Sequence, residues 1–418
     1  MKNSLHYDNI KENKGNTAMY HRFLDKKIEQ TQLPVVFING ARQVGKSTLV
    51  KKIFSHTHDY LTLDDPQTLA LAKQNPLSFI RYAQNPLIID EIQRCPDLLL
   101  AIKTVVDEKR TPRQFILTGS VNILHLAGVK DSLAGRMVVF TLWPLSQEEI
   151  NCGESSFLEN LFKKKIVKPR NTPCDLIECI KRGGYPLAVD VTDSSHRNEW
   201  LNAYLTQILE KDIRDLSNIE GLRELPNILG LLASRTGSLL NASELSRSLQ
   251  ISYTTLKRYL SLLEMTYLFC PLQPWFRNMG KRLVKSEKTF LIDTALIETI
   301  LHRDINADPL LFGHIFENFI AMELTKQLSY KTVPAKLFHY RSVTGEEVDF
   351  ILETTDGSIV GIEVKSTSHF SHKDTKGLRL LKDELKDQFK MGIVLYQGEN
   401  VLPIDENIYA VPAHYMWT

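Results

Sequence analysis

Short apolar runs alternate with helix-length segments through the first third of the chain. The runs fall at residues 34–38, 60–63, 87–89, 115–117 and 137–142. Continuous apolar runs of this length are typical of strands that are buried on both faces of a parallel sheet. Their alternation with helices therefore predicts an α/β fold in which helices cover both faces of the sheet.

The pattern changes after residue 150. A basic, proline-punctuated stretch at Phe162–Arg170 favours a solvated linker, with a DNA-contacting patch as the alternative. Helical periodicity then dominates from Cys174 to Ser238. Beyond it, helix caps at Asn241 and Ser252 predict two short helices joined by a tight turn. A strand-like run follows at 267–272, and this order resembles a winged helix-turn-helix.

A glycine-rich turn directly follows the first apolar run. Its sequence, Gly40-Ala-Arg-Gln-Val-Gly45-Lys46-Ser47, fills every fixed position of GxxxxGK[ST]. In this P-loop motif the backbone N–H groups surround phosphate oxygens, the lysine reaches the β- and γ-phosphates, and the hydroxyl ligates Mg²⁺. We therefore expect an ATP site made of Gly40, Ala41, Arg42, Gln43, Val44, Gly45, Lys46, Ser47 and Thr48, in which Lys46 also acts in catalysis.

A second acidic element follows about forty residues later, where the apolar run Leu87-Ile-Ile ends in Asp90 and Glu91. A carboxylate at the end of such a strand holds Mg²⁺, so we expect Asp90 and Ser47 to share the metal ion. Glu91 is then placed to polarise the attacking water as a general base. The chain has no [NT]KxD guanine-reading motif, so ATP is favoured over GTP.

Two further positions are candidates for phosphate contacts. Thr118 or Ser120, after the run at 115–117, is expected to sense the γ-phosphate or to orient the water. Arg136 either neutralises developing phosphate charge, in its own site or in a neighbour's, or forms a structural salt bridge. The sequence leaves these two roles of Arg136 open.

Several landmarks occur in one order from about residue 34 to 366, namely GARQVGKST, LIIDEIQ, LTGS, SLAGR followed by WPLSQEE, RGGYP, FGHIFENFI, EVDFIL and GIEVKS. With them the chain resembles the prokaryotic AAA-14/DUF4143 family of ATPases. The resemblance implies an ATPase core with an additional strand and a catalytic glutamate. It also implies a central winged-helix region and a C-terminal fold similar to restriction endonucleases.

The last third of the chain contains two strand-like runs with charged residues at alternate positions. Period-two alternation places Glu347 and Asp349 on one face of the first strand, and Glu363 and Lys365 on one face of the second. A hairpin turn at Thr355–Gly357 would bring the two strands side by side. Carboxylates and a lysine are therefore expected to converge.

This is the arrangement of a PD-(D/E)xK nuclease. In that interpretation Asp349 and Glu363 hold Mg²⁺, Lys365 positions or activates the attacking water, and Glu317 is similar to the helical acid of the fold. Two alternatives stay open. The hairpin has only a solvated charged face, or the nuclease-like fold serves as a binding platform without cutting.

The predicted winged helix carries candidate DNA contacts. Arg247, Lys257 and Arg258 are placed to contact phosphates, and Thr254 or Thr255 to approach base edges. Winged helices also pack against neighbouring domains, so both uses stay open.

The chain of 418 residues is thus divided into four expected units. Residues 1–150 form an AAA-type P-loop ATPase domain, and residues 151–235 a linker and helical region. Residues 236–300 form a winged helix-turn-helix, and residues 301–418 a PD-(D/E)xK nuclease-like domain.

The overall composition restricts the class of protein only modestly. With 43% hydrophobic and 24% charged residues the chain is typical of a globular protein. Its net charge of +2 neither supports nor excludes DNA as a partner. A polar N-terminus, and the absence of any apolar run of the roughly 18–20 residues that a membrane helix needs, lead us to expect a cytoplasmic protein without a membrane partner.

Three functions are consistent with these features. The favoured one is an ATPase switch that uses ATP and Mg²⁺ and is coupled to C-terminal domains that bind DNA or protein. The second is an ATP-regulated DNA nuclease. The third is a nucleotide-binding interaction protein with negligible turnover, against which Glu91 argues because a pure binder needs no general base. A homo-oligomer is expected as an option, because AAA-type sites are often completed by a neighbour's arginine.

Overall fold

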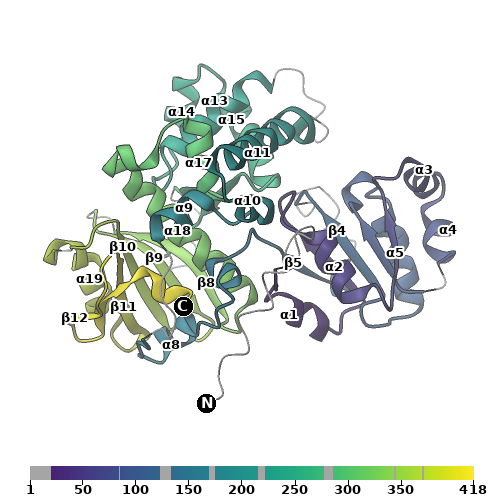
Figure 1. Ribbon diagram of the computed structural model, residues 1–418. Helices are drawn as coiled ribbons and strands as arrows, with labels where there is room; N and C mark the ends of the chain where they lie inside the picture. Colours follow the sequence, from purple (N-terminus) through teal and green to yellow (C-terminus); the bar gives the residue numbers. More distant parts are fainter. Residues whose placement is uncertain are drawn as a thin grey trace, which may run out of the picture.

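The computed structural model describes residues 20–83, 85–122, 133–168, 175–214, 222–276, 286–342, 345–369 and 371–418. An α/β unit at the N-terminal end is followed by a mostly helical central region and by a second α/β unit (Figure 1). Within the described part of the chain, no helix is both long and apolar enough to span a membrane.

The N-terminal unit is built on a five-stranded sheet in the order β2-β3-β4-β1-β5, with all neighbours parallel. Its strands are β1 (Val35–Asn39), β2 (Asp59–Thr62), β3 (Leu87–Asp90), β4 (Phe115–Gly119) and β5 (Met137–Thr141). The helices and helical turns around them are α1 (Asp25–Gln30), α2 (Lys46–Phe54), α3 (Pro66–Gln74), α4 (Pro76–Arg81), η2 (Ile92–Arg94) and α5 (Leu98–Glu108). The parallel α/β fold predicted from the apolar runs is confirmed, and β4 is the additional strand between β1 and β3.

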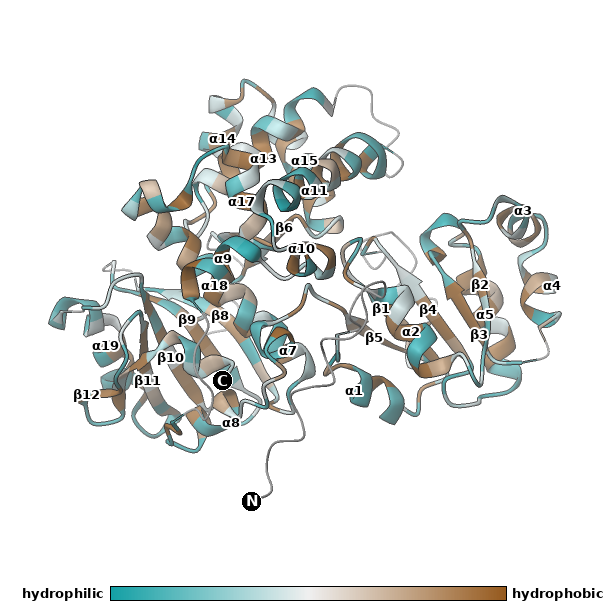
Figure 2. Cartoon of the chain, in the orientation of Figure 1, coloured by the Kyte–Doolittle hydropathy of each residue, from teal (hydrophilic) through white to brown (hydrophobic). Residues whose placement is uncertain are grey.

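Strand β1 shows why these runs form a central sheet. All five of its residues are buried, and the four apolar ones alternate between two separate cores. Val36 and Ile38 pack in the core that contains residues of α2, whereas Val35 and Phe37 pack in the core that contains residues of α5. The strand is therefore apolar on both faces, which is visible as the brown strands inside this unit (Figure 2).

The central region is mostly helical. Its elements are α9 (Leu176–Arg182), α10 (Pro186–Asp190), α11 (Ser194–Gln207), the π-helical turn η4 (Ile208–Asp212), η5 (Leu222–Glu224), α13 (Leu225–Ser234), α14 (Ala242–Ser248), α15 (Tyr253–Met265), β6 (Phe269–Leu272), β7 (Lys288–Leu291), α17 (Thr294–Leu301) and η6 (Ile305–Ala307).

The expected caps of the two short helices are present. Asn241 accepts a hydrogen bond from the backbone N–H of Glu244, and Ser252 accepts one from that of Thr255. Strands β6 and β7 pair antiparallel after these helices. This is the element order expected of a winged helix-turn-helix, whose assignment stays a prediction.

The second α/β unit contains a six-stranded mixed sheet in the order β12-β13-β11-β10-β9-β8. The hairpin predicted from the charged alternation is the antiparallel pair β9–β10, while β10–β11 and β11–β13 are parallel. Its elements are α18 (Pro309–Tyr330), β8 (Ala335–Arg341), β9 (Glu347–Thr354), β10 (Ile359–Lys365), η7 (His372–Thr375), α19 (Lys376–Leu385), η8 (Lys386–Gln388), β11 (Phe389–Tyr396), β12 (Leu402–Asp405), β13 (Ile408–Pro412) and η9 (Ala413–Met416). The similarity to restriction endonucleases stays a prediction.

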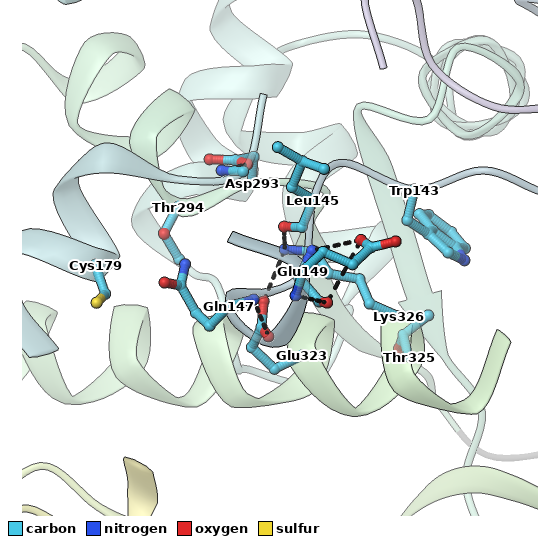
Figure 3. A network of polar contacts seen from close by, with 12 residues as sticks. Trp143, Leu145, Gln147, Glu149, Cys179, Asp293, Thr294, Glu323, Thr325 and Lys326 are labelled. Atoms are coloured by element: carbon cyan, nitrogen blue, oxygen red, sulfur yellow. Dashed lines mark hydrogen bonds and ion pairs between the residues drawn. The ribbon is translucent and has the colours of Figure 1, made fainter. Parts of the chain in front are cut away.

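Residues 143–150, which we call the exit segment, leave the first sheet after β5 and dock on α18. They contain α7 (Gln147–Ile150), and their polar residues Ser146 to Glu149 are at most 3% exposed. The Gln147 backbone N–H donates to Glu323, and Lys326 donates to the Leu145 carbonyl (Figure 3). The next helix, α8 (Phe157–Phe162), packs against β10 and β11, so the stretch after residue 150 is partly a layer of the second unit.

Candidate nucleotide site and a second acidic cluster

The loop between β1 and α2 has a conformation that demands glycine. Gly40 has φ +148° and Gly45 has φ +93°. A Cβ atom on Gly40 would lie 2.1 Å from the carbonyl oxygen of Leu142, which is a backbone atom that cannot move aside cheaply. The loop therefore curls tightly before α2 begins at Lys46, where the free N–H groups of the first helical turn can bind an anion.

Lys46 is buried against its own loop. Its Nζ donates to the carbonyl oxygens of Gly40 (3.0 Å) and Ala41 (2.7 Å). Burial lowers the pKa of Lys46 to about 8, and the nearby carboxylates of Glu91 and Asp90 partly oppose this shift. The ammonium thus lies at the loop carbonyls, from which it can turn to phosphate oxygens.

Asp90, at the end of β3, is held by three hydroxyl groups from three other elements. Ser47 Oγ lies 3.0 and 2.9 Å from its two carboxylate oxygens, and the Tyr60 hydroxyl donates at 2.5 Å. The Thr118 hydroxyl donates to it as well. The structure therefore brings together Ser47, Asp90 and Thr118 as expected, and adds Tyr60, which the motifs did not indicate.

Glu91 has φ +60°, in the left-handed region that non-glycine residues seldom adopt. Its backbone N–H donates to Thr118 Oγ1 (3.2 Å), and its Oε2 accepts a hydrogen bond from Ser120 Oγ (2.9 Å). The Gln93 side-chain amide also donates to Glu91 and, at 2.9 Å, to Ser120. Ser120 and Gln93 therefore fix the carboxylate of the expected base. Gln93 belongs to the LIIDEIQ landmark, but its role was not assigned from sequence.

Arg42 of the loop is directed to the central region. Its Nε forms an ion pair of 2.5 Å with Asp212, a buried residue at the end of the π-helical turn η4. Residues 42 and 212 are too far apart in sequence for any spacing rule to connect them. The contact joins the phosphate loop to the helical region that follows the exit segment.

Arg136 is not brought to this site within its own chain. It directly precedes β5, whereas the loop follows the C-terminal end of the parallel neighbour β1, so the two lie at opposite edges of the sheet. Its guanidinium makes two contacts with Asp107, at 2.5 and 2.9 Å. Within one chain, Arg136 therefore forms the structural salt bridge. A catalytic role of Arg136 would require the site of a neighbouring chain.

The second unit gathers the other predicted residues. Glu317 on α18, Asp349 on β9, and Glu363 with Lys365 on β10 lie around one cluster. Asp349 accepts a hydrogen bond from the backbone N–H of Val364 (2.9 Å). Lys365 lies 3.9 Å from Glu363 and 3.4 Å from Asp374, beside an open cavity of about 420 Å³. The predicted convergence of carboxylates and lysine is therefore present.

A residue that sequence reasoning missed stands in the middle of this cluster. Lys288 Nζ lies 2.8 Å from Glu317, 2.8 Å from Glu347 and 3.2 Å from Asp349. Burial and the Asp349 charge raise the pKa of Glu317 to about 8. Burial would also raise the pKa of Asp349, but Lys288 and the Val364 N–H outweigh it and hold that pKa below its usual value. The carboxylates of this cluster are thus organised around a lysine.

Three family matches divide the chain. Residues 32–151 match an AAA domain (AAA_14), and residues 174–309 and 312–416 match two domains of unknown function (DUF8612 and DUF4143). An uncharacterized protein of Mycobacterium tuberculosis is 29% identical over 391 residues, which are 92% of this chain and 81% of that protein. An uncharacterized protein of Methanocaldococcus jannaschii is 24% identical over 335 residues, which are 72% of this chain and 70% of that protein.

Among solved structures, the Walker-type ATPase PABY2304 of Pyrococcus abyssi is similar with a TM-score of 0.39 at 15% identity, over 66% of this chain and 93% of that one. The family matches and the parallel sheet with its P-loop agree on the N-terminal unit. The chain therefore matches the AAA_14 model over its N-terminal unit and the DUF4143 model over its C-terminal unit, the two families that its sequence landmarks indicate.

Proposed function

We propose that this protein is an ATPase switch that binds Mg-ATP at residues 40–48 and hydrolyses it with Glu91 as the general base. The observation that carries the proposal is the contact of Ser47 Oγ with both carboxylate oxygens of Asp90, at 3.0 and 2.9 Å, next to the buried Lys46. A phosphate-binding loop, a metal-binding pair and a base thereby meet at one edge of the sheet.

The residues present fit Mg²⁺. A serine hydroxyl and a carboxylate are hard oxygen donors, which this ion prefers, and they already lie within hydrogen-bonding distance of each other. When bound, Mg²⁺ would neutralise charge on the β- and γ-phosphate oxygens.

The chain's own groups supply the remaining steps. The Lys46 ammonium exchanges the carbonyls of Gly40 and Ala41 for phosphate oxygens. The carboxylate of Glu91 accepts a proton from the attacking water, and Ser120 and the Gln93 amide hold that carboxylate in place until then. Thr118 contacts both Asp90 and the Glu91 backbone, so it is the residue best placed to respond to the γ-phosphate.

The test compares two variants in ATP binding and in turnover. Glu91→Gln should still bind ATP but hydrolyse it at least about 100-fold more slowly, since a general base typically contributes that much. Lys46→Ala should lose ATP binding itself in calorimetry. Glu108→Gln removes an exposed carboxylate at the end of α5 and should behave as wild type.

The two variants test different parts of the proposal. Wild-type turnover in Glu91→Gln would place the base elsewhere, and unchanged ATP affinity in Lys46→Ala would overturn the nucleotide site. A chain that binds ATP but shows no turnover would be the nucleotide-binding interaction protein instead.

DNA is the partner that we propose for the central region. The side chains of Arg247, Thr254, Lys257 and Arg258 are exposed on α14 and α15, as a DNA-contacting face requires, whereas Thr255 is half-buried. The nuclease alternative is less favoured than the switch, because Lys288 stands among the carboxylates that would have to hold the metal ion. Homo-oligomerisation is proposed only as the way in which Arg136 would reach a nucleotide.

A further inference from the structure

Lys288 is the first residue of β7 and belongs to the central region, but its side chain ends inside the acidic cluster of the second α/β unit. The residue is 2% exposed. Its partners come from two elements of that unit, Glu317 from α18 and Glu347 with Asp349 from β9. One ammonium therefore connects a strand of the central region to a helix and a strand of the DUF4143 domain.

The charge balance explains why the lysine is stable there. A buried ammonium costs several kcal/mol unless it is well paired, and the same holds for each buried carboxylate. Lys288 has three carboxylates within 3.2 Å, and the closest two are at 2.8 Å. Removing the lysine would leave the three carboxyl groups without their common ammonium partner, because the more exposed Lys365 lies near Glu363 and Asp374 instead.

Several carboxylates that converge on one point are also the ligand set of a hard divalent cation. Such an ion needs oxygen distances of about 2.0–2.1 Å for Mg²⁺, shorter than the contacts of the ammonium. Within the described part of the chain, no three His, Cys, Asp or Glu side chains lie as they would have to in order to hold a metal ion. The carboxylates around Lys288 therefore lie at hydrogen-bonding distance from an ammonium group.

We propose that Lys288 is the resident cation of the cluster formed by Glu317, Glu347 and Asp349, and that it closes this cluster to divalent metal ions. The side chain acts as an internal counter-ion that takes the position a metal would need. It follows that Asp349 is not available for metal-dependent phosphodiester cleavage, and that the cluster fastens the central region to the C-terminal domain.

The test counts Mn²⁺ bound to the full-length, nucleotide-free protein by electron paramagnetic resonance. Wild type and Asp349→Asn should bind the same number of ions, because the cluster holds none. Lys288→Met should bind one additional Mn²⁺ per chain, and Lys288→Met combined with Asp349→Asn should lose it again.

Lys326→Met is the matched control. Lys326 is also a buried lysine, but it pairs with a single carboxylate, Glu323, at 2.8 Å and otherwise donates to the Leu145 carbonyl. Its removal should destabilise the protein without creating a cation site. Mn²⁺ should therefore raise the thermal midpoint of Lys288→Met and leave that of Lys326→Met unchanged.

Two results would overturn the proposal. One is a Mn²⁺ ion in wild type that Asp349→Asn abolishes, which would make the cluster a metal centre. The other is a folded Lys288→Met or Lys288→Gln variant that binds no additional Mn²⁺. This would show that the carboxylates do not form a cation site when the ammonium is removed. If neither variant folds, the comparison of wild type with Asp349→Asn decides alone, and none of these results depends on ATP turnover.

Discussion

At the scale of single residues, partners on distant elements decide the protonation and the position of each buried polar group. His339 on β8 is an example, since its ring Nε2 lies 3.1 Å from the Ser286 carbonyl and the residue is 2% exposed. Burial, and secondly the charge of Lys288, lower the pKa of His339 to about 4. Its imidazole is therefore neutral in the folded protein at any pH well above this value.

This histidine should make stability fall with acidification. The unfolded chain takes up the proton near pH 6.5, while the folded chain resists until about pH 4, so stability is lost as pH falls through that window. The loss from this group between pH 7.5 and pH 5 should be about 2 kcal/mol. Thermal midpoints of His339→Gln should show a correspondingly weaker dependence on pH. An unchanged dependence would mean that other groups cause the acid sensitivity.

Local patterns reveal some of these residues and not others. Ser47, Asp90 and Thr118 follow from motifs, because each stands at a fixed place where a strand ends or a helix begins. Lys288 could not be predicted, because its three partners lie 29 to 61 positions later and no repeat connects them. Asp212 could not be predicted either, because its partner Arg42 is also distant in the sequence.

At the scale of elements, backbone geometry at the P-loop contrasts with that of an ordinary helix. Gly40 follows the last residue of β1 and faces the backbone of Leu142 just beyond β5. Gly230 lies inside α13, and a Cβ on it would meet no atom within 4 Å. The same substitution should therefore have opposite effects at the two positions.

Gly40→Ala should lower the free energy of unfolding by about 2 kcal/mol or more, because overpacking against backbone adds to the strain of a positive φ. Gly230→Ala should raise it by about 0.5–1 kcal/mol, the usual gain from alanine in a helix interior. Urea unfolding of both variants checks the pair, with ATP binding measured alongside. Equal effects of the two changes would contradict the geometry of the loop.

The elements themselves were largely predictable. The five strands of the first sheet were expected because each coincides with a continuous apolar run, and the β9–β10 hairpin because its charges alternate. The docking of α8 on the second sheet was not expected, because the basic residues that follow it dominate the local composition. Composition describes exposure to solvent, whereas Phe157, Leu158 and Leu161 decide the packing of α8.

At the scale of the whole molecule, the exit segment connects the nucleotide loop to the C-terminal domain. Arg22 donates to the Val44 carbonyl of the P-loop (3.0 Å) and to the Trp143 carbonyl (2.6 Å), and it pairs with Glu149 at 3.0 Å. Gln147 in turn contacts α18 through Glu323. Buried polar contacts thus lead from the P-loop through Arg22 to the exit segment. Figure 3 shows how that segment continues to α18 through Glu323 and Lys326.

Arg22→Met should remove the contacts of Arg22 with the exit segment and with the P-loop. It leaves the buried Glu149 without its cationic partner, which should cost about 3–5 kcal/mol of stability, and it frees the Val44 carbonyl, which should weaken ATP binding. The measurements are thermal unfolding and ATP calorimetry. Arg110→Met serves as the control, because Arg110 is exposed and reaches Asp107 only at 3.9 Å. Unaltered ATP binding in Arg22→Met would uncouple the P-loop from the exit segment.

The docking of the exit segment also has a consequence for synthesis on the ribosome. The first sheet is complete once Thr141 has emerged, but Glu323, which accepts from the Gln147 N–H, follows that residue by 176 positions, and Lys331 follows Glu148 by 183. At translation rates of about 5–20 residues per second, this delay lasts on the order of 10 to 35 s. For that time the exit segment would lack its contacts with α18 and Lys331, while its pair with Arg22 could already form. The P-loop would then be complete before the C-terminal domain has been synthesised.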